Sequence, residues 1–419
     1  IVSTRMCTHK GLQARQLSQG GLAAQADPQR VGCAVRQARA KPLNKDPDAG
    51  VWVLTDDRAG NRTQAVGLAE ALGVSYQIKE LRFGLLSRLH NLILGASAAV
   101  LTRASRAQVA PPWPQLVIAA GRRGAPVARW IKRQSGRRTL IVQLGRKGGQ
   151  DPRPFDAVVT PVHAALPAHE KRIETLAPLN RASDETLRAA ADAADPFGGG
   201  PKPHVALLVG GATARRHFGA AEAERLGTEV LAAVRAGTEE GPGGTLVAVT
   251  SPRTGAAATE ALVAALGGGG RVFPWRPNDL ANPYLACLAR ADIIVVTGDS
   301  ESMIAEATAT GKAVYLFPFP ARRRGWWLRL GAHVAAAAAQ KRAGQSSLVT
   351  GLCAYLVERG LVRPPRDLDL MHSALVSMEY VKYFDGTLSD RPPPSRFLET
   401  EHVAYSLRAM LSLSGLDRV

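Results

Sequence analysis

Apolar and polar positions follow two alternating patterns from residue 51 onward. Short, nearly continuous apolar runs lie at 51–55, 116–120, 139–144, 156–159, 204–209, 245–250, 292–297 and 313–317. Such runs are typical of parallel strands that are buried on both faces. Between them lie Ala- and Leu-rich segments of helical character, at about 61–72, 125–135, 219–236, 255–266 and 301–310. This alternation of strands and helices predicts an α/β architecture.

A change of composition divides this pattern into two blocks. Residues 189–203 (AAADAADPFGGGPKP) combine a glycine triplet with prolines, which is typical of a linker. We therefore expect two Rossmann-like, doubly wound domains, 51–188 and 204–350, that face each other across a cleft. The remaining residues, 351–419, are interpreted as a helical C-terminal tail, with helices expected at about 346–358, 372–382 and 402–413.

The chain is strongly basic, which favours an anionic partner. It has 419 residues, and 53 Lys and Arg against 35 Asp and Glu give a formal net charge of +18. Nucleic acid, a phospholipid surface and a phosphorylated small molecule all fit such a charge. Residues 1–50 have no aromatic side chain and no sustained periodicity, so we interpret them as a disordered basic leader. No apolar stretch reaches the roughly 18 residues of a membrane-spanning helix, and the four scattered cysteines fit a reducing compartment.

Fingerprints of the common α/β enzymes are missing from the sequence. No G-x-G-x-x-G follows a predicted strand, no G-x-x-x-x-G-K-[ST] occurs, and there is no G-x-S-x-G elbow. A dinucleotide-dependent enzyme is therefore disfavoured, and so are the P-loop and α/β-hydrolase classes.

Polar loops directly follow the predicted strands, at the edge where open α/β sheets bind ligands. The first loop leads from Thr55 to Gln64 and contains Gly60 and Asn61, which can turn backbone N–H groups toward an anion. Another loop, 121–124 (GRRG), places two arginines after a later apolar run. The alternative interpretation is an ordinary capped connection for the first loop and a solvated turn for 121–124.

The second block carries three further loops of this kind. One of them combines glycines for close backbone approach with a hydroxyl beside arginines, and another sets hydroxyls beside an arginine. The candidate residues of these two loops are Gly210, Gly211, Thr213, Ser251 and Arg253. The third begins at Gly298 and leads into a helix that Asp299 or Ser300 is expected to cap.

The third loop is the most informative of the five. N–H groups near Ser300 and Ser302, at the N-terminus of the predicted helix, can hold a diphosphate with the help of the helix dipole. Glu306 lies four residues beyond Ser302 on the same helix face, where its two oxygens can accept hydrogen bonds from a ribose diol. One nucleotide-sized ligand between the two domains accounts for all five loops together.

Several segments taken in order resemble the bacterial branch of the elongated-mitochondria (mitochondrial fission) family. They are WVLTDDRAGNRTQAVGLAEALG, LVIAAGRRGAPVARWIKRQSG, LLVGGATA, TSPRTG and NPYLACLARADIIVVTGDSESMIAEATATGKAVYLF, which together cover about residues 51–330. Bacterial members of that family are regarded as candidate glycosyltransferases. The resemblance therefore implies a GT-B-like pair of domains that binds a nucleoside-diphosphate sugar mainly through the second domain.

The resemblance also implies roles for individual residues. Those that would line the diphosphate, lie at the helix N-terminus, bind the ribose or face the site from the first domain are Gly210, Gly211, Thr213, Ser300, Ser302, Glu306, Gly60, Asn61 and Gln64. The sequence departs from the family at Asp57 and Glu301, where small residues are usual, and at Pro252, where arginine is usual. An acid beside a phosphate site is unfavourable, so Glu301 must point away or donor binding is weakened.

The catalytic assignments follow from position alone. Asp56, at the end of the first strand, is our candidate general base, and His217 is the alternative. Asp367 and Asp369 form a D-x-D pattern remote from the predicted site, which we interpret as coincidence. We therefore expect a metal-independent enzyme without a cofactor, in which the helix N-terminus and arginines stabilise the leaving diphosphate.

Two basic stretches indicate a membrane surface. Residues 81–106 place apolar side chains at helical spacing between arginines, which predicts a basic amphipathic helix that lies on a bilayer or packs on the core. A second stretch sets arginines around adjacent tryptophans: Arg322, Arg323, Arg324, Trp326, Trp327 and Arg329. Both residue types suit an anionic headgroup layer. Nucleic acid could use the same pairing, but no nucleic-acid-binding module is present.

The sequence thus predicts a cytoplasmic glycosyltransferase, peripheral on the inner face of the membrane. It would move a sugar from a nucleoside-diphosphate donor to a lipid-linked or envelope acceptor. The alternative is a non-catalytic GT-B-like scaffold that acts in membrane or organelle division.

Overall fold

The computed structural model describes most of the chain beyond residue 49. The described residues are 50–145, 147–213, 216–237, 243–277, 279, 281–319, 330–331, 333–338, 347–362, 364, 367–389 and 391–413. Residues 1–49 of the predicted leader lie outside them. The predicted Arg/Trp membrane patch, from Arg322 to Arg329, also lies outside them.

The first six strands form one parallel sheet. They are β1 (Val51–Thr55), β2 (Tyr76–Glu80), β3 (Leu116–Ala120), β4 (Leu140–Leu144), β5 (Ala157–Pro161) and β6 (Arg172–Thr175). Their order across the sheet is β2-β1-β3-β4-β5-β6, and Val51 lies opposite both Tyr76 and Leu116. The strand order reverses between β1 and β3, so the loops after these two strands flank the point where such sheets bind ligands.

The other six strands form a second parallel sheet. They are β7 (His204–Leu208), β8 (Thr245–Val249), β9 (Gly270–Phe273), β10 (Ile293–Thr297), β11 (Ala313–Phe317) and β12 (Lys382–Tyr383). Their order is β12-β11-β10-β7-β8-β9. Counted from β7 this is 3-2-1-4-5-6, the strand order of the Rossmann fold, with its reversal between β7 and β10.

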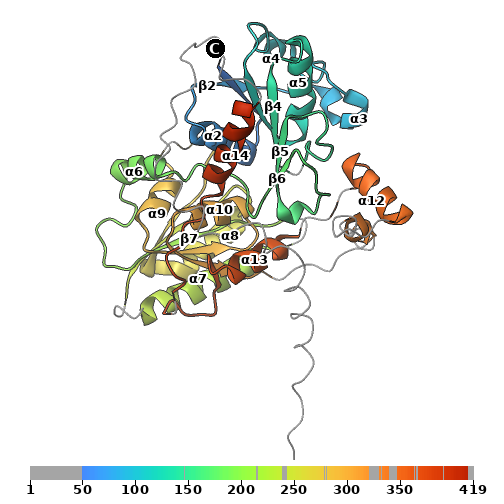
Figure 1. The fold of residues 1–419 in the computed structure, drawn as a ribbon. Coiled ribbons are helices and arrows are strands. Elements are labelled where there is room, and N and C mark those ends of the chain that lie inside the picture. Colours follow the sequence, from blue (N-terminus) through green and yellow to red (C-terminus); the bar gives the residue numbers. More distant parts are fainter. Residues whose placement is uncertain are drawn as a thin grey trace, which may run out of the picture. The chain divides into compact units, whose positions relative to one another are not determined.

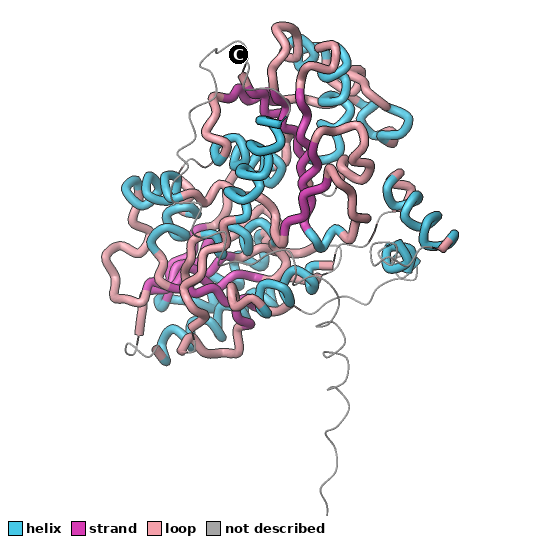
Figure 2. The backbone as a smooth tube through the Cα atoms, in the orientation of Figure 1, coloured by secondary structure: helices cyan, strands magenta, loops and turns pink. Residues whose placement is uncertain are grey.

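Helices connect the strands and lie on the faces of the sheets (Figures 1 and 2). The longer ones are α2 (Ala59–Ala71), α5 (Gly121–Gln134), α6 (Asp184–Ala193), α7 (Ala220–Ala236), α8 (Ala256–Leu266), α9 (Tyr284–Arg290) and α10 (Glu301–Ala309). Beyond the second sheet follow α12 (Leu348–Glu358), α13 (Leu368–Ser377) and α14 (Glu399–Leu413). The structure thus confirms two Rossmann-like, doubly wound domains and a helical C-terminal region.

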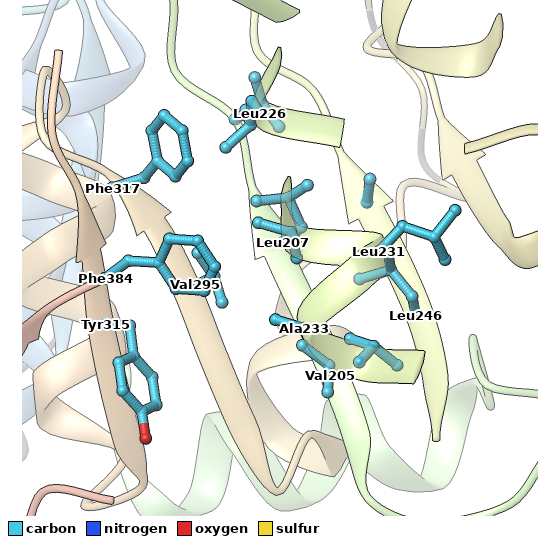
Figure 3. Close-up of a cluster of buried hydrophobic side chains, with 14 of the residues drawn as sticks. Val205, Leu207, Leu226, Leu231, Ala233, Leu246, Val295, Tyr315, Phe317 and Phe384 are labelled. Carbon is cyan, nitrogen blue, oxygen red and sulfur yellow. The ribbon is translucent and has the colours of Figure 1, made fainter. Parts of the chain in front are cut away.

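Both faces of each sheet are buried, which explains the continuous apolar runs. In β7, Val205 and Leu207 face a cluster with Leu226 of α7 (Figure 3), and Ala206 and Leu208 face a separate cluster on the other side. A strand that is buried on both faces has no position at which a polar side chain reaches water.

The strands that the sequence did not predict are β2, β6, β9 and β12, and each is an edge strand of its sheet. In β2 (YQIKE) every residue is partly or fully exposed. An edge strand is open to solvent along one side, so its sequence loses the apolar continuity on which the other predictions relied.

The predicted amphipathic helix over 81–106 is wrong. The segment instead forms a 3-10 turn η1 (Leu85–Arg88) and two short helices, α3 (Asn91–Leu94) and α4 (Arg103–Ala107). Gly84 is extended and Gly95 has φ of +54°, so neither residue continues a helix. An isolated bridge between Phe83 and Leu101 closes the segment into a loop.

The C-terminal residues pack on both sheets. β12 pairs in parallel with β11 at the edge of the second sheet. Helix α14 lies against α2 (Figure 1), and its Val403 and Leu407 belong to the hydrophobic core beside the first sheet. Part of the segment predicted as a linker, 189–203, is also structured, because α6 extends to Ala193.

Candidate functional site

Three loops of the second sheet meet at the buried side chain of Asp299. The loops follow β7, β8 and β10, and Asp299 is 1% exposed. Its carboxylate accepts hydrogen bonds from the Gly211 N–H (3.0 Å), from Thr297 Oγ1 (2.7 Å) and from the Arg253 guanidinium, with which it also forms an ion pair. A buried carboxylate with a cationic partner and several donors is fully compensated, and it fixes the relative positions of the three loops.

The loop after β7 needs its two glycines because Asp299 and the backbone of Arg253 approach it closely. A Cβ atom on Gly210 would overlap both carboxylate oxygens of Asp299, and one on Gly211 would overlap the backbone of Arg253. The Gly210 carbonyl accepts hydrogen bonds from Ser251 Oγ (2.7 Å) and from the Thr254 hydroxyl. The loop after β7 is therefore held on one side by residues that follow β8 and on the other by residues at the end of β10.

The N–H groups of this loop are already bonded. Gly210 donates to Thr297 Oγ1 (2.8 Å) and Gly211 to Asp299, while the Thr213 N–H donates to the Arg216 carbonyl (3.0 Å). The structure thus brings the predicted residues of the β7 and β8 loops together. It uses the N–H groups of Gly210, Gly211 and Thr213 within the protein rather than leaving them directed at a ligand.

The N-terminus of α10 lies beside this cluster. Ser300 is the N-cap residue, but its side chain makes no capping hydrogen bond, and Asp299 is engaged elsewhere. The expectation that one of these two side chains caps the helix is therefore wrong, because the buried ion pair takes Asp299 away. The first N–H groups of any α-helix have no acceptor within the helix. N–H groups at the start of a helix can bind an anion.

Glu306 lies one turn deeper in α10 and is buried, at 8% exposure. The Tyr284 hydroxyl, from the start of α9, donates a hydrogen bond to Glu306 Oε2. Burial raises the pKa of Glu306 from 4.5 to about 7, while the Tyr284 hydrogen bond and the charge of Arg181 act in the opposite direction. Arg181 itself forms a two-pronged pair with Glu70 at 2.6 and 3.0 Å.

Glu301, the first residue of α10, is bound by a histidine of the first domain. His163 Nε2 lies 2.7 Å from Glu301 Oε2, and the His163 ring is buried in the turn η2 (Val162–Ala164) after β5. The Glu301 carboxylate is thus held by His163 at the start of α10. No sequence motif marks His163 or Tyr284, and both were missed.

The predicted residues of the first domain gather at its own switch point. Asp56 Oδ1 accepts hydrogen bonds from Asn61 Nδ2 (3.0 Å) and from the Arg58 N–H (3.2 Å). A Cβ on Gly121 would lie 2.6 Å from Asn61 Nδ2, so the loops after β1 and β3 are in contact. Gly60 and Gln64 lie on the first turns of α2 beside them.

The alternative base and the acidic pattern have structural partners. His217 is exposed, and its Nδ1 lies 3.1 Å from Glu222 Oε1 near the start of α7. Asp369 of the D-x-D pattern is bound by the buried Arg216 at 2.6 Å.

Among the residues that the structure describes, no group of His, Cys, Asp and Glu side chains is arranged to hold a metal ion. Within the same residues, no helix is both long and apolar enough to span a bilayer.

Comparison with known proteins shows that most of the chain matches one protein family. The family model described as Mitochondrial fission ELM1 matches residues 59–344. The chain belongs to this family. The matched span includes the loops after β3, β7, β8 and β10, and it begins at the first residue of α2, beyond Asp56.

Two relatives and one solved structure illustrate the similarity. Mitochondrial fission protein ELM1 of Arabidopsis thaliana is 30% identical over 251 residues, which are 54% of this chain and 56% of that protein. The chain thus spans little more than half of that relative's length. The uncharacterized protein RP120 of Rickettsia prowazekii is 25% identical over 303 residues, 64% of this chain and 82% of that protein. MurG of Acinetobacter baumannii is 14% identical, with a TM-score of 0.34 over 86% of this chain and 99% of MurG. A score of that size carries no conclusion about this chain.

Proposed function

We propose that this ELM1-family chain is a glycosyltransferase that moves a sugar from a nucleoside-diphosphate donor to a lipid-linked or envelope acceptor at the cytoplasmic face of a membrane. One observation carries the proposal. The N-terminus of α10 lies next to glycine loops at the switch point of a Rossmann-ordered sheet, and the buried carboxylate of Glu306 follows one turn later. That spacing suits a diphosphate followed by a ribose.

The donor would bind with its diphosphate at the start of α10. The N–H groups there and the hydroxyls of Ser300 and Ser302 would donate to the phosphate oxygens, and the helix dipole would favour their charge. In its ionised form, in which both oxygens are acceptors, Glu306 would accept hydrogen bonds from the two ribose hydroxyls. As the sugar departs, the same donors would stabilise the charge that develops on the leaving diphosphate, without a metal ion.

The general base remains Asp56 in this proposal, with His217 as the alternative. Asp56 lies at the carboxyl end of β1, the edge of the first sheet where an acceptor would bind. The hydrogen bonds from Asn61 and Arg58 hold its carboxylate in one orientation. A carboxylate so held can accept the proton of an acceptor hydroxyl when that hydroxyl comes within hydrogen-bonding distance.

A thermal-shift screen tests donor binding. The full chain is heated with UDP-, GDP-, ADP- and CDP-sugars, and we expect one donor class to stabilise it. A ligand at a hundred times its Kd adds about 2.7 kcal/mol. The shift should be lost in Glu306→Ala and retained in Glu224→Ala, an exposed glutamate of α7. Equal shifts in both variants would show that the ribose assignment is wrong.

A second candidate function is a non-catalytic scaffold in membrane or organelle division. The observation that favours it is the closed state of the β7 loop, in which Gly210 and Gly211 donate within the protein and Asp299 neutralises Arg253. A site closed in this way is stable without a ligand. If no nucleotide or nucleotide sugar shifts the melting temperature, the scaffold is the better account.

A further inference from the structure

Five apolar side chains are exposed together on one loop of the first domain. They belong to η1 and α3 and their flanks, and are 41–77% exposed: Leu85, Leu86, Leu89, Leu92 and Ile93. We call this set the apolar ridge. Contiguous exposed apolar groups on a protein surface mark an interaction site more often than chance.

The backbone of the apolar ridge is fixed by the protein. Arg122, at the start of α5, donates to the Leu89 carbonyl (2.6 Å) and to the Ser87 carbonyl. Asn91 Nδ2 donates back to the Arg122 carbonyl (3.1 Å), and the Gly84 N–H donates to Val100 (2.8 Å). In this arrangement Ser87 is buried while the leucines face outward. The ridge therefore presents its apolar side chains from a rigid loop.

A basic cavity lies beside the ridge. It has a volume of about 490 Å³, and its ionisable lining residues are all cationic: Arg129, Lys132, Arg133, Arg137, Arg153 and Lys171. We call it the basic pocket. Ala96, which follows the ridge in the chain, also lines it.

The charge of the basic pocket is only partly neutralised. Lys132 pairs with Asp156 (2.6 Å) and Arg153 with Asp151 (2.7 Å). No carboxylate of the described chain lies within ion-pair distance of Arg133, and the same holds for Arg137. Burial lowers the pKa of the neighbouring Arg129. A concave site with excess positive charge favours a multiply charged anion.

The ridge and the pocket share a border. Arg129 and Phe155 line both the basic pocket and a smaller cavity of about 160 Å³, and Leu92 of the ridge lines that smaller cavity. Helix α12 carries further exposed apolar side chains, since Leu348, Val349, Leu352 and Tyr355 are 49–95% exposed. His90 Nε2 lies 3.1 Å from the Gly360 carbonyl, which joins the end of α12 to the ridge.

We propose that this combined surface binds a bilayer of anionic phospholipid. The apolar ridge enters the headgroup region, and the basic pocket takes the phosphate of a neighbouring lipid. An apolar ridge next to uncompensated arginines matches the layering of a membrane, where hydrocarbon lies directly below anionic headgroups. A nucleic acid would leave the leucines without a partner. The inference names the membrane contact of the proposed function and rests on it.

Vesicle flotation of the full chain tests the proposal. The vesicles contain phosphatidylcholine alone or mixed with phosphatidylglycerol, and the wild type should bind only the mixture. Arg133→Glu/Arg137→Glu should weaken that binding at least about tenfold, because each basic contact with an anionic surface is worth roughly a fewfold in affinity. Leu85→Ser/Ile93→Ser should weaken it similarly. The matched control is Arg235→Glu/Arg276→Glu, which changes the charge equally on exposed arginines of the second domain.

Several outcomes would overturn the proposal. They are unchanged vesicle binding in both ridge and pocket variants, an equal loss in the control, or single-stranded RNA that displaces the wild type from vesicles. Circular dichroism and melting temperature confirm that each variant is folded. The nucleotide-sugar thermal shift is measured on the same variants and should be unchanged. A chain that binds vesicles as predicted but shows no shift with any nucleotide would refute the proposed function and leave the membrane surface intact.

Discussion

Glu306→Gln should change how the stability of the protein depends on pH. Burial raises the pKa of Glu306 from 4.5 to about 7. The folded chain therefore holds this proton more tightly than the unfolded chain, so the contribution to stability is complete below pH 4.5 and is lost as pH rises through 7. A shift of about 2.5 units at 1.36 kcal/mol per unit gives roughly 3 kcal/mol. Glutamine stays neutral and can still accept the Tyr284 hydrogen bond.

Urea unfolding at pH 5, 6, 7 and 8 measures this effect. We expect the wild type and Glu306→Gln to be similarly stable at pH 5, and the variant to be the more stable by up to about 3 kcal/mol at pH 8. Glu399 is the matched control, because burial also raises its pKa to about 7 and it accepts hydrogen bonds from the Leu176 and Ala177 N–H groups. Glu399→Gln should flatten the pH dependence without affecting nucleotide binding, whereas Glu306→Gln should affect both. An unchanged slope in Glu306→Gln would refute the reasoning.

Substitutions at three other positions test the packing and the charges described above. Gly210→Ala should destabilise the protein by about 2–4 kcal/mol in urea unfolding, because its Cβ would overlap the buried carboxylate of Asp299; a loss below 1 kcal/mol would contradict the close packing. Glu301→Gln should tighten nucleotide binding in calorimetry, since it removes a negative charge beside the proposed diphosphate site and weakens the contact with His163; weaker binding would count against that site. Leu407→Ala should cost about 3 kcal/mol, because this α14 side chain is 1% exposed in the core beside the first sheet; a neutral effect would mean that α14 does not pack there.

The central strands could be predicted from the sequence because burial on both faces leaves a local signature. Strands such as β1 and β10 are continuous apolar runs, and parallel pairing forces the loops that follow them to the same edge of the sheet. For that reason Gly210, Ser251 and Gly298 could be grouped in advance without knowledge of the strand order. The edge strands gave no such signature, since one side of each faces solvent.

The partners inside the site could not be predicted, because they depend on contacts between distant segments. From the sequence, Asp299 is expected to cap a helix. In the structure it is the buried side chain at which three loops meet, and Arg253 of the loop after β8 forms an ion pair with it. Tyr284 and His163 lie 22 and 138 residues away from the acids they contact, and no local pattern marks such pairs. The ridge over Leu85–Ile93 likewise has helical spacing, but Arg122 holds its backbone in turns.

The central claim is that α10 and Glu306 bind a nucleoside diphosphate. A crystal structure of the full chain with the nucleotide selected by the thermal-shift screen tests it most directly. We predict that the diphosphate lies within hydrogen-bonding distance of the first N–H groups of α10 and that the ribose hydroxyls lie on the Glu306 carboxylate. A nucleotide bound elsewhere, or an empty site at concentrations far above Kd, would contradict the account.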